Sequence, residues 1–246
     1  MSVDYHHATN VHSLKGARAA LPLLLARAHA GSLLDVGCGT GTWMKAALDF
    51  GIADVFGIDG VQVPADQLHV PAEKIARQEL SRPWNLGRRF DAVICLEVAE
   101  HLDRECAPGL IDSLARHADL VYFSAACPGQ EGQHHVNCQW PAYWQQLFNA
   151  RGFSCSDEPR WELWDLADVE PWYRQNLFVA RRAPDVAGRE PRIKPIIHPE
   201  MLRSILTSPE HFQNHVQQIE QGRLPASWYL KAPVVALSQK SKRRLS

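Results

Sequence analysis

The chain has 246 residues, and its 26 Lys and Arg residues nearly balance its 27 Asp and Glu residues, so the formal net charge is −1 with histidines neutral. A charge so close to zero provides no overall attraction to polyanions, which disfavours nucleic acid as a partner. Hydrophobic residues make up 46% of the chain. That content supplies a substantial core and excludes intrinsic disorder as the main state.

Signals for membranes and secretion are not found in the sequence. The longest apolar run, Ala19 to Ala26, is interrupted by Pro22 and followed by Arg27. A membrane-spanning helix needs about 20 apolar residues, and a secretory signal needs a basic segment leading into an apolar one. The six cysteines include no Cys-x-x-Cys pair. We therefore expect no membrane span, free thiols, and a location in the reducing cytoplasm.

The predicted elements alternate between helices and buried strands. Leucines at helical spacing predict an amphipathic helix within residues 11–30. The elements expected after it are, in chain order, strand Ser32–Val36, helix Thr42–Phe50, strand Asp54–Asp59, strand Phe90–Leu96, helix Cys106–His117 and strand Leu120–Ala126. Such alternation predicts an α/β protein with a mostly parallel sheet and helices on both faces.

The pattern then changes to a polar, glycine-rich loop at residues 127–137. A helix from Pro141 to Arg151 and a late strand from Tyr173 to Arg182 complete the predicted α/β unit. Four prolines between residues 183 and 199 indicate a stiff connector that leads into a helical stretch, Pro199 to Gly222. The expected segments are therefore 1–30, 31–182 and a C-terminal helical extension, 183–246.

A glycine-rich turn lies between the first predicted strand and its helix. Glycines at positions 37, 39 and 41 let the backbone turn tightly and approach a ligand. The Gly-x-Gly-x-Gly spacing differs from the dinucleotide-binding Gly-x-Gly-x-x-Gly, so it disfavours a pyrophosphate. Asp59 follows Gly39 by 59 − 39 = 20 residues, where a carboxylate can accept hydrogen bonds from both ribose hydroxyls of an adenosine group.

Three segments together resemble the class I S-adenosylmethionine-dependent methyltransferases: Leu33 to Gly41, Asp59, and Phe90-Asp-Ala-Val-Ile-Cys-Leu-Glu-Val-Ala-Glu-His-Leu102. The resemblance spans Gly31 to Arg182 and implies a Rossmann-like, seven-stranded, mostly parallel sheet that binds S-adenosylmethionine. Glu79 departs from the commoner Asp at its position. The cofactor contacts that the resemblance implies are Asp35, Gly37, Cys38, Gly39, Gly41, Asp59, Glu79, Leu80, Leu96, Glu97 and His101.

Two of the acidic residues have alternative interpretations. The Asp35 carboxylate can hold backbone amides of the glycine loop instead of touching the methionine amino group. Glu100, beside His101, can simply favour the N-terminus of a following helix. Both alternatives remain open at this point.

The loop after the last parallel strand resembles a bacterial subgroup of these methyltransferases that often accompanies cell-surface polysaccharide, nucleotide-sugar or other small-molecule biosynthesis. The resemblance implies a small-molecule acceptor, such as a sugar hydroxyl. A hydroxyl must lose its proton, so His135 is the candidate base and Asn137 its orienting group. The alternative is that both residues pin the loop to the sheet. We predict no metal site, because no nearby carboxylate or cysteine pair completes a ligand set with His134 and His135 at a familiar spacing along the sequence.

Other functions remain to be weighed beside this one. A methyltransferase for protein or another polymer would share the cofactor motifs, and a non-catalytic cofactor-binding scaffold could retain them. The segment after Leu96 lacks the Asn/Asp-Pro-Pro-aromatic motif of enzymes that methylate base amino groups. Glycine spacing and the Glu97 to His101 segment disfavour a nicotinamide oxidoreductase.

Overall fold

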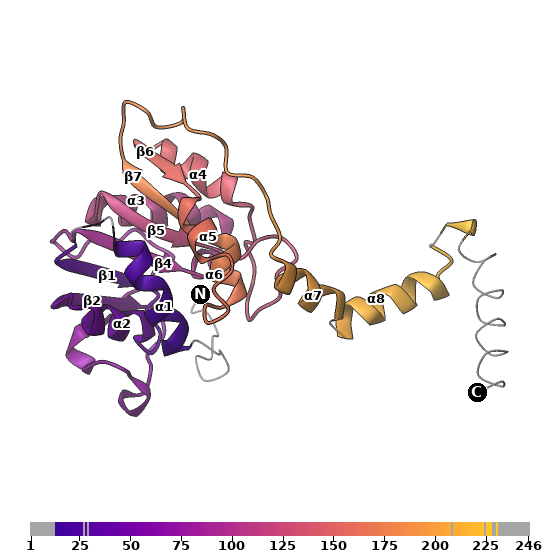
Figure 1. The fold of residues 1–246 in the computed structure, drawn as a ribbon, viewed down its shortest axis with the longest axis horizontal. Helices are drawn as coiled ribbons and strands as arrows, with labels where there is room; N and C mark the ends of the chain where they lie inside the picture. The colour runs from indigo at the N-terminus through magenta and orange to yellow at the C-terminus, as the bar shows by residue number, and fades with distance from the viewer. Residues whose placement is uncertain are drawn as a thin grey trace. The chain divides into compact units, whose positions relative to one another are not determined.

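The computed structural model of the chain describes residues 13–26, 28, 30–207, 209–223, 225–227 and 230 (Figure 1). The chain divides into two compact units, the first ending at Met201 and the second beginning at Leu202. Residues 1–12 of the expected N-terminal segment lie outside the described residues. Within the described part, no helix has the length and apolar character needed to cross a membrane.

The first unit is built on a sheet of seven strands with the order β3-β2-β1-β4-β5-β7-β6. β1 to β5 are parallel, and β7 is antiparallel to both β5 and β6. The predicted seven-stranded, mostly parallel sheet is therefore confirmed. The strands are β1 (Ser32–Val36), β2 (Asp54–Asp59), β3 (Ile75–Arg77), β4 (Ala92–Leu96), β5 (Leu120–Ser124), β6 (Phe153–Ser156) and β7 (Phe178–Arg182).

Helices cover both faces of this sheet and bury two separate hydrophobic clusters. Leu33 and Leu34 of β1 belong to different clusters, because successive strand residues point to opposite faces. α1 (Leu14–Leu25) and α2 (Thr42–Phe50) pack on one face, and α3 (Ala107–His117) and α4 (Pro141–Asn149) on the other. The remaining helices are α5 (Glu158–Leu163), α6 (Pro171–Asn176), α7 (Pro199–Thr207), α8 (Pro209–Glu220) and the short 3-10 helices η2 (Ala65–Gln67), η3 (Ala72–Lys74), η4 (Ala99–His101) and η5 (Arg104–Cys106).

The strand order creates a crevice beside β1. From β1 the chain moves to β2 and β3 on one side, and it then returns to β4 on the other side. In the register, Val36 pairs with both Ile58 and Cys95, so the carboxyl ends of β1, β2 and β4 lie at one edge. Ligands of open α/β sheets bind at such a switch point.

The expected strand from Tyr173 to Arg182 is wrong in its first half. Residues 171–176 form α6, and β7 begins only at Phe178. Pro171 occupies the first turn of α6, where its missing N–H costs nothing. The sequence also missed β3 and β6, which have three and four residues and too few positions to show a pattern.

The expected boundary at Arg182 falls inside the first compact unit, because the proline-rich connector is held on the sheet. The Glu190 carboxylate accepts hydrogen bonds from Asn149 Nδ2 (2.6 Å), Gln145 Nε2 (3.1 Å) and the Cys155 amide (3.1 Å). Desolvation opposes ionisation of Glu190, yet these bonds lower its pKa to about 2. The helical extension expected after the connector is confirmed as α7 and α8.

Candidate active site

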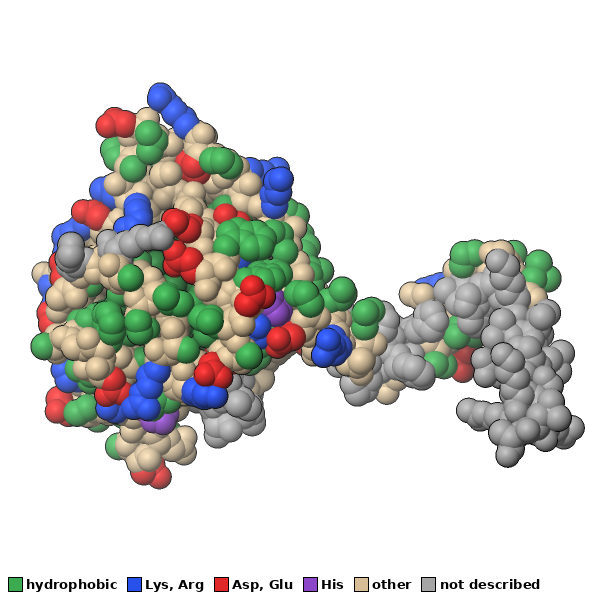
Figure 2. Space-filling view, in the orientation of Figure 1, with side chains coloured by type: hydrophobic (Ala, Val, Ile, Leu, Met, Phe, Trp, Pro, Cys, Tyr) green, Lys and Arg blue, Asp and Glu red, His purple; other side chains and the backbone are tan. Residues whose placement is uncertain are grey.

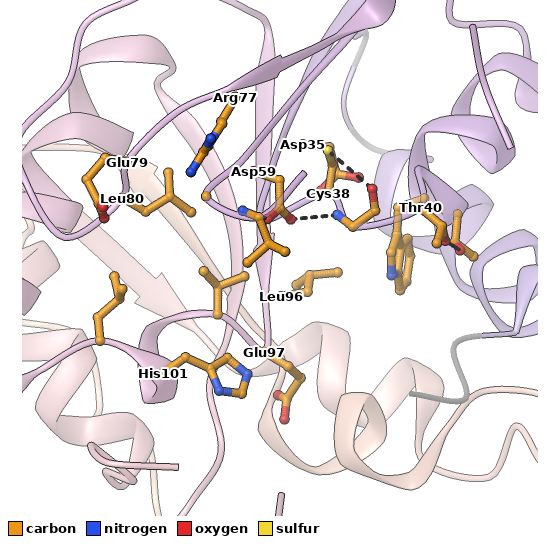
Figure 3. A pocket seen from close by; sticks show the side chains of 18 of the residues that line it. Asp35, Cys38, Thr40, Asp59, Arg77, Glu79, Leu80, Leu96, Glu97 and His101 are labelled. Atoms are coloured by element: carbon orange, nitrogen blue, oxygen red, sulfur yellow. Dashed lines mark hydrogen bonds between the residues drawn. The ribbon is translucent and has the colours of Figure 1, made fainter. Parts of the chain in front are cut away.

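A cleft opens at the carboxyl ends of β1, β2 and β4, where the fold places a switch point (Figure 3). It is an open cleft of about 990 Å³ when the solvent-filled space at its mouth is included. Every residue predicted to contact the cofactor lines this cleft except Gly41. The sequence did not single out the other lining residues, which are Thr40, Thr42, Trp43, Gly60, Val61, Arg77, Val98, Leu102 and Tyr173.

The glycine loop takes backbone conformations that suit glycine. φ is +73° at Gly37, +51° at Gly39 and +79° at Gly41. A Cβ on Gly37 would lie 2.3 Å from Val98 Cγ2, so the loop and the Val98 side chain touch. Gly41 instead packs toward Val70, whose Cγ2 would be 2.8 Å from an added Cβ. Gly41 therefore allows the start of α2 to pack closely against Val70, and it does not face the cleft.

Asp59, at the end of β2, fixes the glycine loop and also faces the cleft. Its side chain is only 7% exposed, and its two oxygens accept hydrogen bonds from the amides of Gly39 (2.8 Å) and Val61 (2.7 Å). Figure 3 shows the bond to Gly39 above the open space of the cleft. Because Asp59 also lines the cleft, its carboxylate lies where ligand hydroxyls can donate to it.

Asp35, at the end of β1, is a buried carboxylate with a vacant acceptor. It is 3% exposed, and its Oδ2 has no hydrogen-bond partner in the part of the chain that the structure describes. Burial, together with the charge of Asp59, raises the pKa of Asp35 to about 8. The loop amides of Gly37 and Cys38 donate to the Ile58 carbonyl at 2.8 and 3.1 Å. This arrangement leaves the Asp35 carboxylate suited to a cationic group of a ligand.

Glu97, directly after β4, is held by residues from two distant segments. Its carboxylate accepts from Gln130 Nε2 (2.7 Å) and Asn176 Nδ2 (3.2 Å), and Asn176 also donates to Gln130 Oε1 (2.8 Å). Burial raises the pKa of Glu97. Its φ of +54° is rare for a residue with a side chain and costs about 1–3 kcal/mol. The surrounding bonds hold the strained residue in place.

The far end of the cleft is more apolar. Leu80 and Leu96 are buried side chains in its wall, and Glu79 lies beside Leu80 (Figure 3). Glu79 accepts a hydrogen bond from the Ser81 amide at 3.0 Å, and this bond lowers the pKa of Glu79. The glutamate that departs from the commoner aspartate therefore still presents a carboxylate at this end.

His101 lines the cleft, whereas His135 and Asn137 do not. The rings of His101 and His135 are adjacent, with centroids 5.1 Å apart. Burial, together with the charge of His135, lowers the pKa of His101 to about 4, so this imidazole is neutral near pH 7. Nδ1 of His135 lies 2.9 Å from the Gln130 carbonyl oxygen. The structure thus places His101, rather than His135, directly on the cleft.

Asn137 holds the loop in place. Its amide and that of Val136 both donate to the Glu100 carbonyl, at 3.0 and 2.9 Å. Its Oδ1 accepts from Gln139 Nε2 at 3.2 Å, and the residue is 2% exposed. These contacts correspond to the alternative in which Asn137 pins the loop.

Glu100 is fully buried and lies close to the two histidines. A carboxylate oxygen of Glu100 and a ring nitrogen from each of His101 and His135 lie within 4.8 Å of one another. The sequence shows no carboxylate at a familiar metal-ligand spacing from His135, but the fold brings the Glu100 carboxylate close to it. Glu100 precedes His135 by 135 − 100 = 35 residues. The fold brings them together through the bonds of the loop to the Glu100 carbonyl, a contact that spacing could not reveal.

The sequence did not predict Tyr173 and Asn176 as site residues, because they belong to α6, and this segment was expected to be a strand. The Tyr173 hydroxyl accepts a hydrogen bond from Trp43 Nε1 at 3.4 Å, and the two rings meet edge to face. Arg77, at the end of β3, was missed because the strand itself was missed. Pro171, in the first turn of α6, is a local signal that could have indicated this helix.

Comparison with known proteins identifies the family. Residues 8–164 match a family described as "Methyltransferase domain". The chain belongs to this family. It is a methyltransferase, and the resemblance to S-adenosylmethionine-dependent enzymes is confirmed, with S-adenosylmethionine as the family's cofactor. No curated protein sequence matches the chain significantly.

Solved structures share the fold of the methyltransferase. DesVI of Streptomyces venezuelae is 19% identical, with a TM-score of 0.50 over 69% of this chain and 92% of its own. CalS10 from Micromonospora echinaspora, an amino pentose methyltransferase solved with S-adenosylmethionine, is 17% identical, with a TM-score of 0.52 over 70% and 92%. The sugar N-methyltransferase KedS8 from Streptoalloteichus sp. is 21% identical, with a TM-score of 0.50 over 69% and 87%. At these identities the likeness establishes the fold.

Proposed function

We propose that the methyltransferase transfers a methyl group from S-adenosylmethionine bound in this cleft to a hydroxyl of a small molecule, such as a sugar, a nucleotide sugar or a related intermediate. The observation that carries the proposal is the pairing of two buried carboxylates beside the glycine loop. Asp59 lines the cleft at the end of β2, where its carboxylate can accept from ribose hydroxyls, and Asp35 has an oxygen with no partner among the described residues that suits the cationic amino group. Leu80 and Glu79 then border the adenine, and Glu97 lies toward the sulfonium.

For methyl transfer to a hydroxyl, the protein mainly has to align the acceptor with the sulfonium and remove the hydroxyl proton. The sulfonium is already activated, so an in-line acceptor oxygen attacks the methyl carbon while the S–C bond breaks. Glu97 and His101 line one side of the cleft, and their side chains can accept the hydroxyl proton. His101 is neutral near pH 7 and adjoins His135, the base predicted from the sequence. We place the acceptor on this side.

A small acceptor is supported by the charge of the protein. On the visible face of the first unit, Lys and Arg side chains are interspersed with Asp and Glu (Figure 2). Ion pairs in this unit include Arg18 with Asp49 and Arg89 with Asp119. CalS10 and KedS8, which act on sugars, use the same fold. For the reaction we propose the cytoplasm, because all six cysteines are free thiols.

The test begins with calorimetry of S-adenosylhomocysteine binding. Asp59→Ala should weaken binding about 10- to 100-fold, because hydrogen bonds to a charged group contribute about 1.5–3 kcal/mol and 1.4 kcal/mol is a factor of ten. Asp66→Ala removes an exposed carboxylate outside the cleft and should leave affinity unchanged. An unchanged dissociation constant in Asp59→Ala would contradict the assignment.

The acceptor class is tested with methyl-labelled S-adenosylmethionine and fractionated host extract. Label in a small-molecule or glycan fraction supports the proposal, and mass spectrometry then identifies the methylated atom. If label is found only in protein or another polymer, the small-molecule proposal is wrong and the protein is a polymer methyltransferase. Binding of S-adenosylhomocysteine without label in any fraction would favour a non-catalytic scaffold.

A further inference from the structure

Glu100, His101 and His135 form a compact group of three donor side chains next to the cleft, here called the Glu-His-His cluster. One donor atom from each lies within 4.8 Å of the other two. Glu100 and His101 come from η4, and His135 comes from the loop after β5. His101 also lines the cleft, so whatever the cluster binds faces the acceptor side of the site.

Glu100 is the residue of the cluster whose buried carboxylate most requires a compensating cation or hydrogen-bond donor. The residue is 0% exposed, and among the described residues neither oxygen of its carboxylate has a hydrogen-bond partner of good geometry, although the Ala126 backbone and the Glu97 carboxyl make weaker contacts with it. A buried carboxylate that lacks well-formed hydrogen bonds is unfavourable unless a cation or a stronger donor compensates it. The neighbouring charged group is Glu97, whose own carboxylate is already held by Gln130 and Asn176. Two acidic groups and two imidazoles thus converge with no cationic side chain among them.

His135 is arranged as metal-binding histidines are. Its Nδ1 lies 2.9 Å from the Gln130 carbonyl oxygen, which fixes the ring and leaves Nε2 as the nitrogen with a lone pair. A Cβ on Gly132 would lie 2.2 Å from Nε2 and 2.3 Å from Cε1 of this ring. The glycine therefore lets the backbone pack against the imidazole without displacing it.

We propose that the Glu-His-His cluster binds a divalent transition-metal ion, such as Mn²⁺, Co²⁺ or Zn²⁺, at the acceptor side of the cleft. Two imidazole nitrogens and a carboxylate form a ligand set that these ions accept, whereas Mg²⁺ prefers oxygen ligands. A bound ion compensates the charge of Glu100, and Glu97 adds to the negative field that attracts it. His135 then acts as a ligand, and the sequence-based expectation of no metal site is replaced.

The consequence for catalysis rests on the proposed function. An acceptor hydroxyl bound to the ion loses its proton to water more readily than a free hydroxyl does. The resulting oxygen forms a bond to the methyl carbon, and the electrons of the broken S–C bond return to sulfur as a neutral thioether. The ion is neither oxidised nor reduced.

The test uses the full-length protein, stripped of metal with a chelator and titrated with Co²⁺. Wild type should bind a single ion and develop the visible absorption of histidine-ligated Co²⁺. His135→Ala and Glu100→Gln should weaken binding by more than about 100-fold, because even residues that only support a ligand change affinity 10- to 100-fold. Gly132→Ala should weaken it by displacing the His135 ring. His134→Asn is the matched control, since position 134 is exposed, lies outside the cluster and has a φ of +50° that Asn tolerates.

The outcomes separate this proposal from the proposed function. Loss of Co²⁺ binding in the cluster variants, with S-adenosylhomocysteine affinity and thermal unfolding retained, supports the metal site. Absence of Co²⁺ binding in wild type overturns it, as does equal binding in His135→Ala or an equal loss in His134→Asn. If S-adenosylhomocysteine fails to bind wild type while Co²⁺ binds, the cofactor assignment fails and the metal site stands. A Zn²⁺ and Mg²⁺ competition series should show Zn²⁺ displacing Co²⁺ at far lower concentration than Mg²⁺.

Discussion

Gly37 and Gly87 have nearly the same backbone conformation but different surroundings. φ is +73° at Gly37 and +70° at Gly87. A Cβ on Gly37 would lie 2.3 Å from Val98 Cγ2, whereas a Cβ on Gly87 would meet nothing within 4 Å. Gly87→Ala therefore measures the cost of the backbone conformation alone. Gly37→Ala measures the same cost plus the collision with Val98.

The two contributions can be separated by size. An L-residue in the left-handed region costs about 1–2 kcal/mol, so Gly87→Ala should lower the free energy of unfolding by that amount. Overpacking a buried contact costs about 1–3 kcal/mol more, so Gly37→Ala should lower it by about 2–5 kcal/mol. The effect of Ala on the unfolded chain is the same in both variants and cancels in their difference.

Urea unfolding of four variants tests this reasoning: Gly87→Ala, Gly37→Ala, Val98→Ala, and the double variant of Gly37 and Val98. Removing the Val98 methyls makes room for the new Cβ, so the double variant should lose about 1–3 kcal/mol less than the sum of its singles. If Gly37→Ala costs no more than Gly87→Ala, or if the singles add, the close approach of loop and Val98 does not constrain the site. Gly37→Ala should also weaken binding of S-adenosylhomocysteine, whereas Gly87→Ala should not.

Two further predictions concern the buried acidic groups of the cleft. Burial and then the charge of Asp59 raise the pKa of Asp35 from 3.8 to about 8, so as the pH rises the unfolded chain loses this proton first. The contribution of Asp35 to stability is therefore complete below about pH 4 and is lost as the pH rises to about 8. Urea unfolding should show a shallower decline over that range in Asp35→Asn, and an equal decline would count against the raised pKa. Asn176→Asp replaces the donor 3.2 Å from Glu97 with a second acceptor and should lower the free energy of unfolding by about 1–3 kcal/mol, while the exposed Asn85→Asp serves as the control; equal effects would refute the role of Asn176.

Local sequence determined the half of the site that the glycine loop builds. The elements Ser32–Val36, Thr42–Phe50 and Asp54–Asp59 were predicted with the bounds that the structure has. Each is specified within a few neighbouring residues, by an apolar run, helical spacing or a glycine at a turn. Because parallel strands end at one edge, locating the ends of β1, β2 and β4 was enough to gather the predicted cofactor residues around one cleft.

Tertiary structure alone decided the side of the cleft where we propose that the acceptor binds. Asn176 reaches Glu97 across 79 residues, and Glu100 meets His135 across 35, so no spacing along the chain marks either pair. Segment 173–182 was read as one strand, yet its first residues form a helix whose buried amides are paired with distant groups. Strand and helix periodicity report which face of an element is apolar, and they carry no information about which polar groups the fold brings together. The sequence therefore predicted the half of the cleft around the glycine loop, but not the half beside Glu97 and His101, where we propose that the acceptor binds.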